Sequence, residues 1–216
     1  PFCRYWLHNN MVTLNGQKMG KSLGNSILLK QMFRDGHALL EKTFEPAVIR
    51  HFILTSHYRA PLDFSNEALK GTEAGSYKLR DAVRELAKAV RRHGGTELRP
   101  IEEGGRRRHE ETGITDLPAL AKTDSVRTAL HEVVKRFTDV MNEDFNTAAA
   151  IATVFDFTKQ TGNWIADAAP AEDLLAANAL MQRLVGDALG LKWQDTAGGA
   201  AAEAERNGLI QILVDL

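Results

Sequence analysis

The chain carries two lysines three residues apart, Lys18 and Lys21, in the run KMGKSLGN over residues 18–25. Two ammonium groups on one flexible loop can neutralise a polyphosphate. A reaction that expels pyrophosphate builds negative charge on the leaving group, so lysines held there would stabilise the transition state more than the ground state. A loop that closes on its substrate and opens for release suits such chemistry. Two lysines alone, however, favour an ordinary solvent-exposed loop.

The neighbouring residues predict the elements that hold these lysines. Residues 11–14 alternate as in a short strand, and Asn15-Gly16 supplies a turn before a polar loop over residues 17–25. Ser26 is expected to cap a helix with an apolar side formed by Leu28, Leu29, Met32 and Phe33. Pro46 fits the first turn of a second helix, whose apolar face comprises Val48, Ile49, Phe52 and Ile53.

From Ser65 onward, apolar residues recur at helical spacing. Four stripes follow: Leu79, Val83, Leu86 and Val90; Val126, Leu130, Val133, Phe137 and Val140; Ile151, Val154 and Phe155, from about Thr147; and Leu174, Ala177, Met181, Leu184 and Ala188, after Pro170. Residues 93–122 are rich in glycine and charge, which predicts a mobile connection, and Gly198-Gly199 precedes a possible further helix over 200–216. The pattern predicts a mainly α fold, with a helix bundle after the strand and loop.

Composition sets broad limits. The 216 residues are 44% hydrophobic and can fill a core, and no run approaches 18 apolar residues, so no membrane association is expected. The net charge of −1 hides a gradient: residues 78–108 carry 10 Lys/Arg against 5 Asp/Glu, whereas residues 109–216 carry 8 against 17. A basic middle could meet phosphates, although ordinary solvated faces explain the charge equally well. With one cysteine, Cys3, no internal disulfide can form, and a cytoplasmic location fits best.

Residues 18–25 resemble the Lys-Met-Ser-Lys-Ser signature of class I aminoacyl-tRNA synthetases and the Leu-Gly-Asn that often follows it. The resemblance implies that Lys18 and Lys21 are catalytic and bind ATP, with Lys21 as the main contact and Ser22 in support. Met19 is expected to anchor the loop. Gly20 stands where the family usually has serine, which puts a side-chain contact at that position in doubt.

Four further blocks resemble cysteinyl-tRNA synthetases in particular. They are residues 5–12 (YWLHNNMV), 49–59 (IRHFILTSHYR), 62–65 (LDFS) and 141–147 (MNEDFNT). The resemblance covers residues 4–92 and 124–165, and it implies that backbone groups of Met11 and Val12 lie beside the adenine of ATP. Methionyl-type enzymes fit these blocks poorly.

Each block also has a structural interpretation. Trp6 and Tyr58 are expected to pack, and His8 and His57 could be hydrogen-bonded structural histidines. Arg59 could meet a tRNA phosphate or a nearby carboxylate. The acidic turn, with Asp144 and Asn146, is best explained by capping of free helix N–H groups: Asp144 is a turn residue and Asn146 a cap.

The resemblance also implies what lies elsewhere. The family's His-Ile-Gly-His-like segment, its zinc ligands and its anticodon-reading domain have no counterpart in this sequence, and the chain lacks an initiator Met. We therefore expect a C-terminal fragment that is inactive alone, Cys3 as a packing residue and no metal ligand within this chain. The expected domains are 1–64, the end of the catalytic domain with helices that contact the tRNA stem; 65–195, a tRNA-binding bundle; and 196–216, a linker and the start of a further region.

The implied function is ATP-dependent activation of cysteine, with Mg²⁺, and its transfer to tRNA(Cys) by an enzyme that carries Zn²⁺ and is expected to be monomeric. Basic candidates for tRNA contact are Arg59, Arg80, Arg84, Lys88, Arg91, Arg92 and Arg106 to Arg108. Such contacts would be mostly to phosphate and sugar. Two alternatives stay open: a related ligase that joins cysteine to an amino sugar, and a non-catalytic RNA-binding module.

Overall fold

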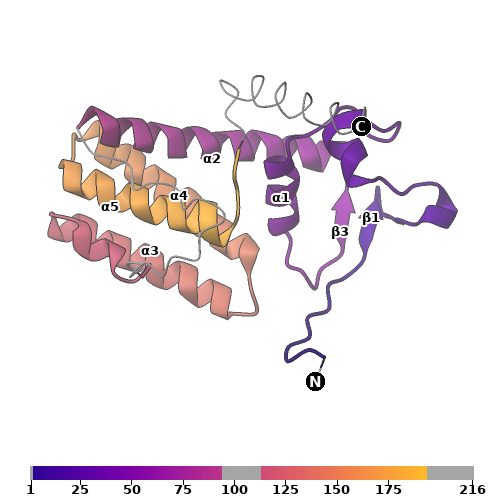
Figure 1. Cartoon of the computed structure of the whole chain (residues 1–216), viewed down its shortest axis with the longest axis horizontal. Helices are drawn as coiled ribbons and strands as arrows, with labels where there is room; N and C mark the ends of the chain where they lie inside the picture. Colours follow the sequence, from indigo (N-terminus) through magenta and orange to yellow (C-terminus); the bar gives the residue numbers. More distant parts are fainter. Residues whose placement is uncertain (1, 94–112, 194–216) are drawn as a thin grey trace, which may run out of the picture.

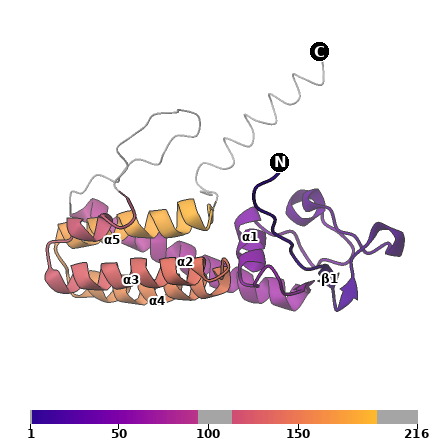
Figure 2. The same ribbon diagram turned by 90° about the horizontal axis from the view of Figure 1, so that it is seen from below.

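A computed structural model of the chain describes residues 2–93 and 113–193. A small sheet and helix α1 (Pro46–Leu54) occupy one end of the elongated molecule, and a bundle of helices α2 to α5 occupies the other (Figure 1). Helix α2 (Asn66–Arg92) runs along both parts. A quarter turn of the molecule shows the same two-part arrangement (Figure 2).

The sheet has three short strands in the order β2-β1-β3. Strand β1 (Val12–Leu14) pairs antiparallel with β2 (Gln17–Lys18) and parallel with β3 (Leu62–Phe64). The predicted strand and its turn are confirmed: Asn15 and Gly16 have φ of 50° and 76°, the positive values of a tight hairpin turn. The prediction of a loop from residue 17 was wrong for Gln17 and Lys18, because a two-residue turn pairs the next residues with β1.

The helix predicted from Ser26 forms only over residues 29–35, and its residues Gln31–Asp35 are π-helical. The Ser26 cap was wrong, because the backbone N–H of Leu28 donates to the side chain of Gln31 at 2.9 Å. Leu28 and Leu29 are 59% and 63% exposed, whereas Met32 is buried. Of the predicted apolar side, only Met32 and the partly buried Phe33 reach the core, which accounts for a helix shorter than predicted.

Helix α1 begins at Pro46 as predicted. Its buried face holds Val48, Ile49 and Phe52, but Ile53 is 46% exposed and does not belong to it. One residue beyond Phe52 turns the side chain by about 100°, off the buried stripe.

The bundle confirms the predicted helical stripes. It consists of α2, α3 (Asp124–Asn142), α4 (Thr147–Ala166) and α5 (Ala171–Met181). Ser65 caps α2, since its Oγ accepts from the N–H of Ala68 at 3.2 Å. Leu69 lies in the core beneath the sheet and Leu79 in the bundle core, so α2 belongs to both; the boundary at residues 64–65 stays a prediction.

The last stripe departs from prediction at its end. Ala188 is exposed and Leu189 is buried in its place. Residues Gln182–Ala188 are π-helical, and a π turn adds a residue to the helical period, which moves the buried position from 188 to 189.

Part of the predicted mobile connection is ordered. Leu117–Leu120 form a 3₁₀ turn, and Leu117, Pro118 and Ala121 are buried against the bundle. The carboxylate of Asp173, fully buried on α5, accepts the N–H groups of Lys122 and Thr123 at 2.7 and 3.0 Å. The prediction was therefore wrong for residues 113–122. Residues 94–112 and the helix predicted over 200–216 lie outside the described residues.

Candidate functional site

The lysine loop, residues 18–25, is held by β1 and by its own last residue. The N–H of Met19 donates to the carbonyl of Val12 at 3.2 Å, and the half-buried Met19 side chain packs against the core beneath the sheet. Asn25 closes the loop, since its Oδ1 accepts the N–H of Gly20 at 2.9 Å and its Nδ2 donates to the carbonyl of Lys18 at 3.0 Å. These bonds fix both ends of the segment that bears the two lysines.

A 3₁₀ turn, Lys21–Leu23, presents the second lysine, and Gly24 follows at φ 66°. Lys18, Lys21 and Ser22 are all exposed. Within the described residues, no carboxylate pairs with either lysine. Both ammonium groups therefore point to solvent, where an anionic ligand can reach them.

Gly20 has extended backbone, with φ −165° and ψ 146°. A Cβ built there would meet nothing closer than 3.9 Å, at Leu23 Cδ1. Serine, the residue expected from the family pattern, would therefore fit this position without strain.

Asp63 on β3 is a positioning residue that the sequence reasoning missed. Its Oδ1 accepts the hydroxyl of Thr13 at 2.6 Å and the N–H of Gly16 at 2.7 Å. These hydrogen bonds, from Thr13 first and then Gly16, lower the pKa of the Asp63 carboxyl. Asp63 thereby holds the hairpin that leads into the lysine loop. Asp63 lies in the block 62–65, whose resemblance to the family could have pointed to it. Asn25, which closes the lysine loop, was likewise missed although it ends residues 18–25.

The backbone of Met11 and Val12 forms the entry to the loop hairpin. The carbonyl of Met11 accepts the N–H of Leu62 at 3.1 Å, and its own N–H donates to Oδ1 of Asn10 at 2.7 Å. The Asn10 amide in turn donates to the carbonyl of Arg59 at 2.8 Å. Asn10 was also missed, although it lies in the block 5–12.

Arg59 meets a carboxylate in this structure. Its Nε lies 2.8 Å from Oδ2 of Asp144, and the hydroxyl of Tyr58 donates to Oδ1 of Asp144 at 2.6 Å. The Tyr58 hydrogen bond first, and then the Arg59 charge, lower the pKa of the Asp144 carboxyl. The prediction that Asp144 satisfies helix N–H groups was wrong, because its side chain bonds Tyr58 and Arg59, in the segment after α1. Asn146 is the cap, accepting from the Ala149 N–H at 3.1 Å.

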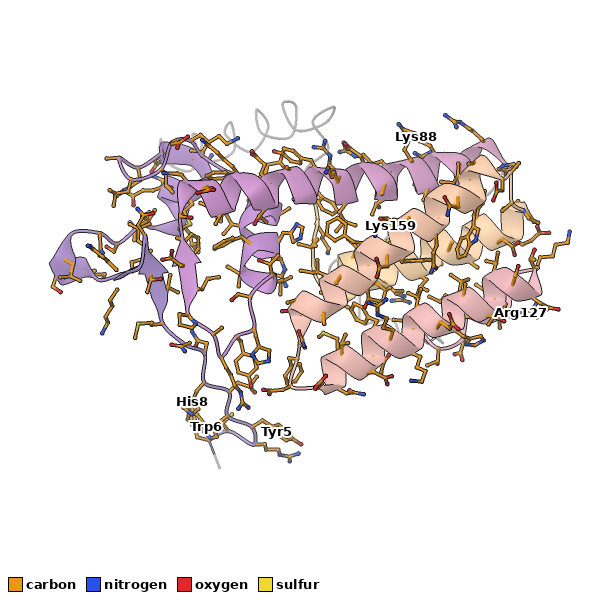
Figure 3. The ribbon with its side chains drawn as sticks, turned by 180° about the vertical axis from the view of Figure 1, so that it is seen from behind. Tyr5, Trp6, His8, Lys88, Arg127 and Lys159 are labelled. Carbon is orange, nitrogen blue, oxygen red and sulfur yellow. The ribbon has the colours of Figure 1, made fainter. Side chains whose placement is uncertain are left out.

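The N-terminal aromatic residues do not pack as predicted. Trp6 is 67% exposed, and its ring contacts those of Phe2 and His8, each with centroids 6.4 Å apart. Tyr5, Trp6 and His8 project from the sheet end of the molecule (Figure 3). Cys3, expected to be a packing residue, is exposed as well. Among the described residues, no cluster of His, Cys, Asp and Glu could hold a metal ion.

The basic candidates on α2 lie in the second half of the helix, at positions outside its buried stripe. They are Arg80, Arg84, Lys88, Arg91 and Arg92. Arg80 pairs with Asp81 at 3.0 Å and lies over the Tyr77 ring, and Lys88 pairs with Glu85 at 2.7 Å. Lys88 lies on the edge of the bundle formed by α2, far from Arg127 on α3 (Figure 3). Arg106 to Arg108 lie outside the described residues.

Within the described part of the chain, no helix is both long enough and apolar enough to cross a membrane.

Comparisons with known proteins match two separate segments of the chain. Residues 1–74 match the family model of the tRNA synthetases class I (C) catalytic domain, and residues 136–194 match the DALR domain. Three curated proteins named Cysteine--tRNA ligase align over most of this chain. The protein of Chlorobium luteolum is 37% identical over 92% of the chain, that of Bacteroides fragilis 36% over 98%, and that of Chlorobaculum tepidum 34% over 100%. The chain covers 33%, 37% and 37% of these relatives.

Proposed function

Since this chain belongs to the cysteinyl-tRNA synthetase family of class I enzymes, we propose that it supplies the pyrophosphate-side loop and a tRNA-side bundle to ATP-dependent charging of tRNA(Cys) with cysteine. Lys18 and Lys21 neutralise the pyrophosphate that leaves when cysteine attacks the α-phosphate of ATP. Because negative charge develops there only as the bond breaks, the two ammonium groups lower the barrier more than they tighten ATP binding.

One observation carries the proposal. The lysine loop is fixed at both ends by Asn25, yet within the described residues neither lysine is paired with a carboxylate. Surface lysines elsewhere in the chain, such as Lys30, Lys42 and Lys88, are ion-paired. Preorganised cations with no internal partner are what a developing anion needs, since little reorganisation is required at the moment of reaction.

Other groups of the loop take supporting roles. Backbone groups of Met11 and Val12 line the adenine side, Ser22 and Gly20 contact phosphate, and Met19 anchors the loop against the core. ATP brings its Mg²⁺ with it. The described residues offer no cluster fit for Zn²⁺, so we assign any zinc ligands to other parts of the enzyme.

On the bundle, the basic face of α2 and Arg59 meet the tRNA backbone. Phosphate contacts of this kind position the RNA without reading its sequence. Arg59 keeps part of its guanidinium available, since its side chain is 67% exposed even while paired with Asp144.

The test uses the full-length enzyme that contains this chain and measures cysteine-dependent ATP–pyrophosphate exchange. Lys21→Ala is expected to lower kcat about 100-fold with a small change in KM for ATP, as for loss of other transition-state donors. Lys18→Ala should show a smaller loss of the same kind. Lys30→Ala, which removes an exposed lysine paired with Asp35, is the control and should keep full activity.

The same assay separates the alternatives. Exchange with cysteine followed by transfer to an amino sugar, and not to tRNA, would favour the related small-molecule ligase. Absence of any cysteine-dependent exchange in the full-length protein would favour a non-catalytic RNA-binding module. Unchanged exchange after loss of both lysines would refute the mechanism proposed for the loop.

A further inference from the structure

The turn between α3 and α4 carries an unusual backbone. Asp144 and Phe145, two consecutive non-glycine residues, have φ of 57° and 55°. Aspartate tolerates this left-handed region, but a bulky residue such as phenylalanine rarely adopts it. Phe145 is 53% exposed, so burial of its ring does not explain the strain. Strain of this kind persists where the surrounding structure holds it, and it is concentrated at functional positions.

The surrounding structure does hold this turn. The N–H of Phe145 donates to the carbonyl of Met141 at 3.0 Å, and the hydroxyl of Thr147 donates to the carbonyl of Leu54, the last residue of α1, at 2.8 Å. The turn is thereby docked against the segment that connects α1 with β3 (Figure 1). The strained conformation aims the Asp144 carboxylate at that segment.

Three consecutive residues of the segment converge on Asp144. Arg59 and Tyr58 contact it as described above, and His57 Nε2 lies 3.7 Å from Oδ2 of Asp144. The Nδ1 atom of His57 accepts the N–H of Arg59 at 3.3 Å, which leaves Nε2 to face the carboxylate. The Tyr58 hydroxyl also accepts from Arg59 Nε at 2.9 Å. One carboxylate therefore fixes the conformation of the whole turn 57–59.

The same turn is bonded to the strand that bears the lysine loop. The N–H of Asn10 donates to the carbonyl of Tyr58 at 2.9 Å, and its side-chain amide donates to the carbonyl of Arg59. Asn10 then accepts the N–H of Met11, one residue before β1, and Lys18 is paired with Thr13 of β1. Hydrogen bonds joined by short stretches of backbone thus link the bundle to the loop.

We propose that Asp144 is a positioning residue, which acts from the bundle through the turn 57–59 and Asn10 to place the Met11–Val12 backbone and the lysine loop for amino acid activation. The inference rests on the proposed function for its effect on catalysis. Its structural half does not, because the linkage from Asp144 to Asn10 exists whatever the reaction.

The test compares Asp144→Asn with Asp139→Asn in the full-length enzyme. Asparagine tolerates the left-handed backbone and keeps the size of the side chain, so the fold should persist. Asp139 is an exposed aspartate on α3, the helix that precedes this turn; it is ion-paired with Lys135 at 2.7 Å and serves as the matched control. Tyr58→Phe is a second variant, which removes only one hydroxyl of the linkage.

Two readouts are needed. Hydrogen–deuterium exchange should show faster exchange of the Asn10 and Met11 amides in Asp144→Asn and in Tyr58→Phe, but not in Asp139→Asn. Cysteine-dependent pyrophosphate exchange should show kcat about tenfold lower with little change in KM for ATP, because misplacement of the loop affects the transition state. An Asn10→Ala variant combined with Asp144→Asn should lose no more than the larger single loss, because both act through one linkage.

The outcomes distinguish the two proposals. Unchanged amide exchange at residues 10 and 11 would overturn the inference, as would altered amide exchange with full activity. Multiplying losses in the double variant would also count against it, since independent destabilisation behaves in that way. If the wild-type enzyme fails to activate cysteine yet the amide exchange responds as expected, the proposed function fails and the structural linkage stands.

Discussion

The side-chain oxygen of Asn25 accepts the backbone N–H of Gly20, five positions earlier in the chain, at 2.9 Å and so closes the loop into a ring. Gly20 is extended and Gly24 is left-handed, so regular secondary structure alone does not define the path of this loop. One amide side chain, with its second bond to the carbonyl of Lys18, supplies the missing restraint.

Asn25→Ala should therefore loosen the lysine loop without unfolding the protein. Because a looser loop must be ordered during reaction, kcat for cysteine-dependent pyrophosphate exchange should fall about tenfold while KM for ATP changes little. Asn25→Asp keeps the acceptor for Gly20 but loses the donor to Lys18, so an intermediate loss is expected. Asn163→Ala, at an exposed position on α4, is the control. Full activity in Asn25→Ala would contradict this role.

Gly20→Ser should be tolerated, whereas Gly24→Ser should not. A Cβ at Gly20 meets no atom closer than 3.9 Å on an ordinary extended backbone. Gly24 has equally open surroundings but φ of +66°, so serine there carries a backbone cost of about 1 kcal/mol. Gly20→Ser should match the wild type in both urea unfolding and pyrophosphate exchange, whereas Gly24→Ser should show slower pyrophosphate exchange. Equal effects of the two would mean that backbone conformation is not what distinguishes them.

The helices of the bundle could be predicted from the sequence because each one carries its own period. Leu79, Leu86 and Val90 fall on one face of α2 by spacing alone, and all three are buried. Among the bundle helices, the prediction fails in the last stripe, at the π-helical segment before Leu189, where the helical period changes. Local rules thus sufficed wherever a helix is long and regular.

The candidate site could be predicted only in part. The two lysines were found by resemblance, but their supports act at a distance: Asp63 bonds Gly16 from 47 residues away, and Asp144 bonds Arg59 from 85. The alternation at residues 11–14 predicted strand β1 but not its neighbour, because β1 pairs with β3 about 50 residues further along the chain. Nothing in the local pattern indicates a partner so far away, so Asp144 was predicted to be a turn residue that serves nearby helix N–H groups.

Binding of tRNA(Cys) by the full-length enzyme should depend on Lys88 and not on Lys159. Both lysines form the same kind of helical ion pair, with Glu85 at 2.7 Å and with Asp156 at 3.1 Å, but they lie on α2 and α4 respectively (Figure 3). Lys88→Ala should weaken binding and reduce the slope of log affinity against log salt by about one, as for one lost phosphate contact. Lys159→Ala should leave the slope unchanged. A salt-insensitive affinity in the wild type would refute phosphate contact altogether.

His51 should make the stability of the protein depend on pH. The residue is 2% exposed near the end of α1, and its Nδ1 has no hydrogen-bond partner among the described residues. Its ring lies against Phe155 with centroids 6.0 Å apart. Burial lowers the pKa of His51 from its ordinary value of 6.5, because the charged imidazolium loses hydration. Below pH 6.5 the unfolded chain takes up a proton that the folded chain resists, so the free energy of unfolding falls as the pH drops.

This contribution is fully present above pH 6.5 and is lost as the pH falls below it, with a slope of at most about 1.4 kcal/mol per pH unit from one histidine. Urea unfolding at pH 7.5, 6.5 and 5.5 measures it, and the comparison is between variants because carboxyl groups titrate as well. His51→Leu should flatten the pH dependence, whereas His131→Gln, at an exposed position on α3, should leave it as in the wild type. If His51→Leu kept the full acid sensitivity, the proton uptake would have to be assigned to another group.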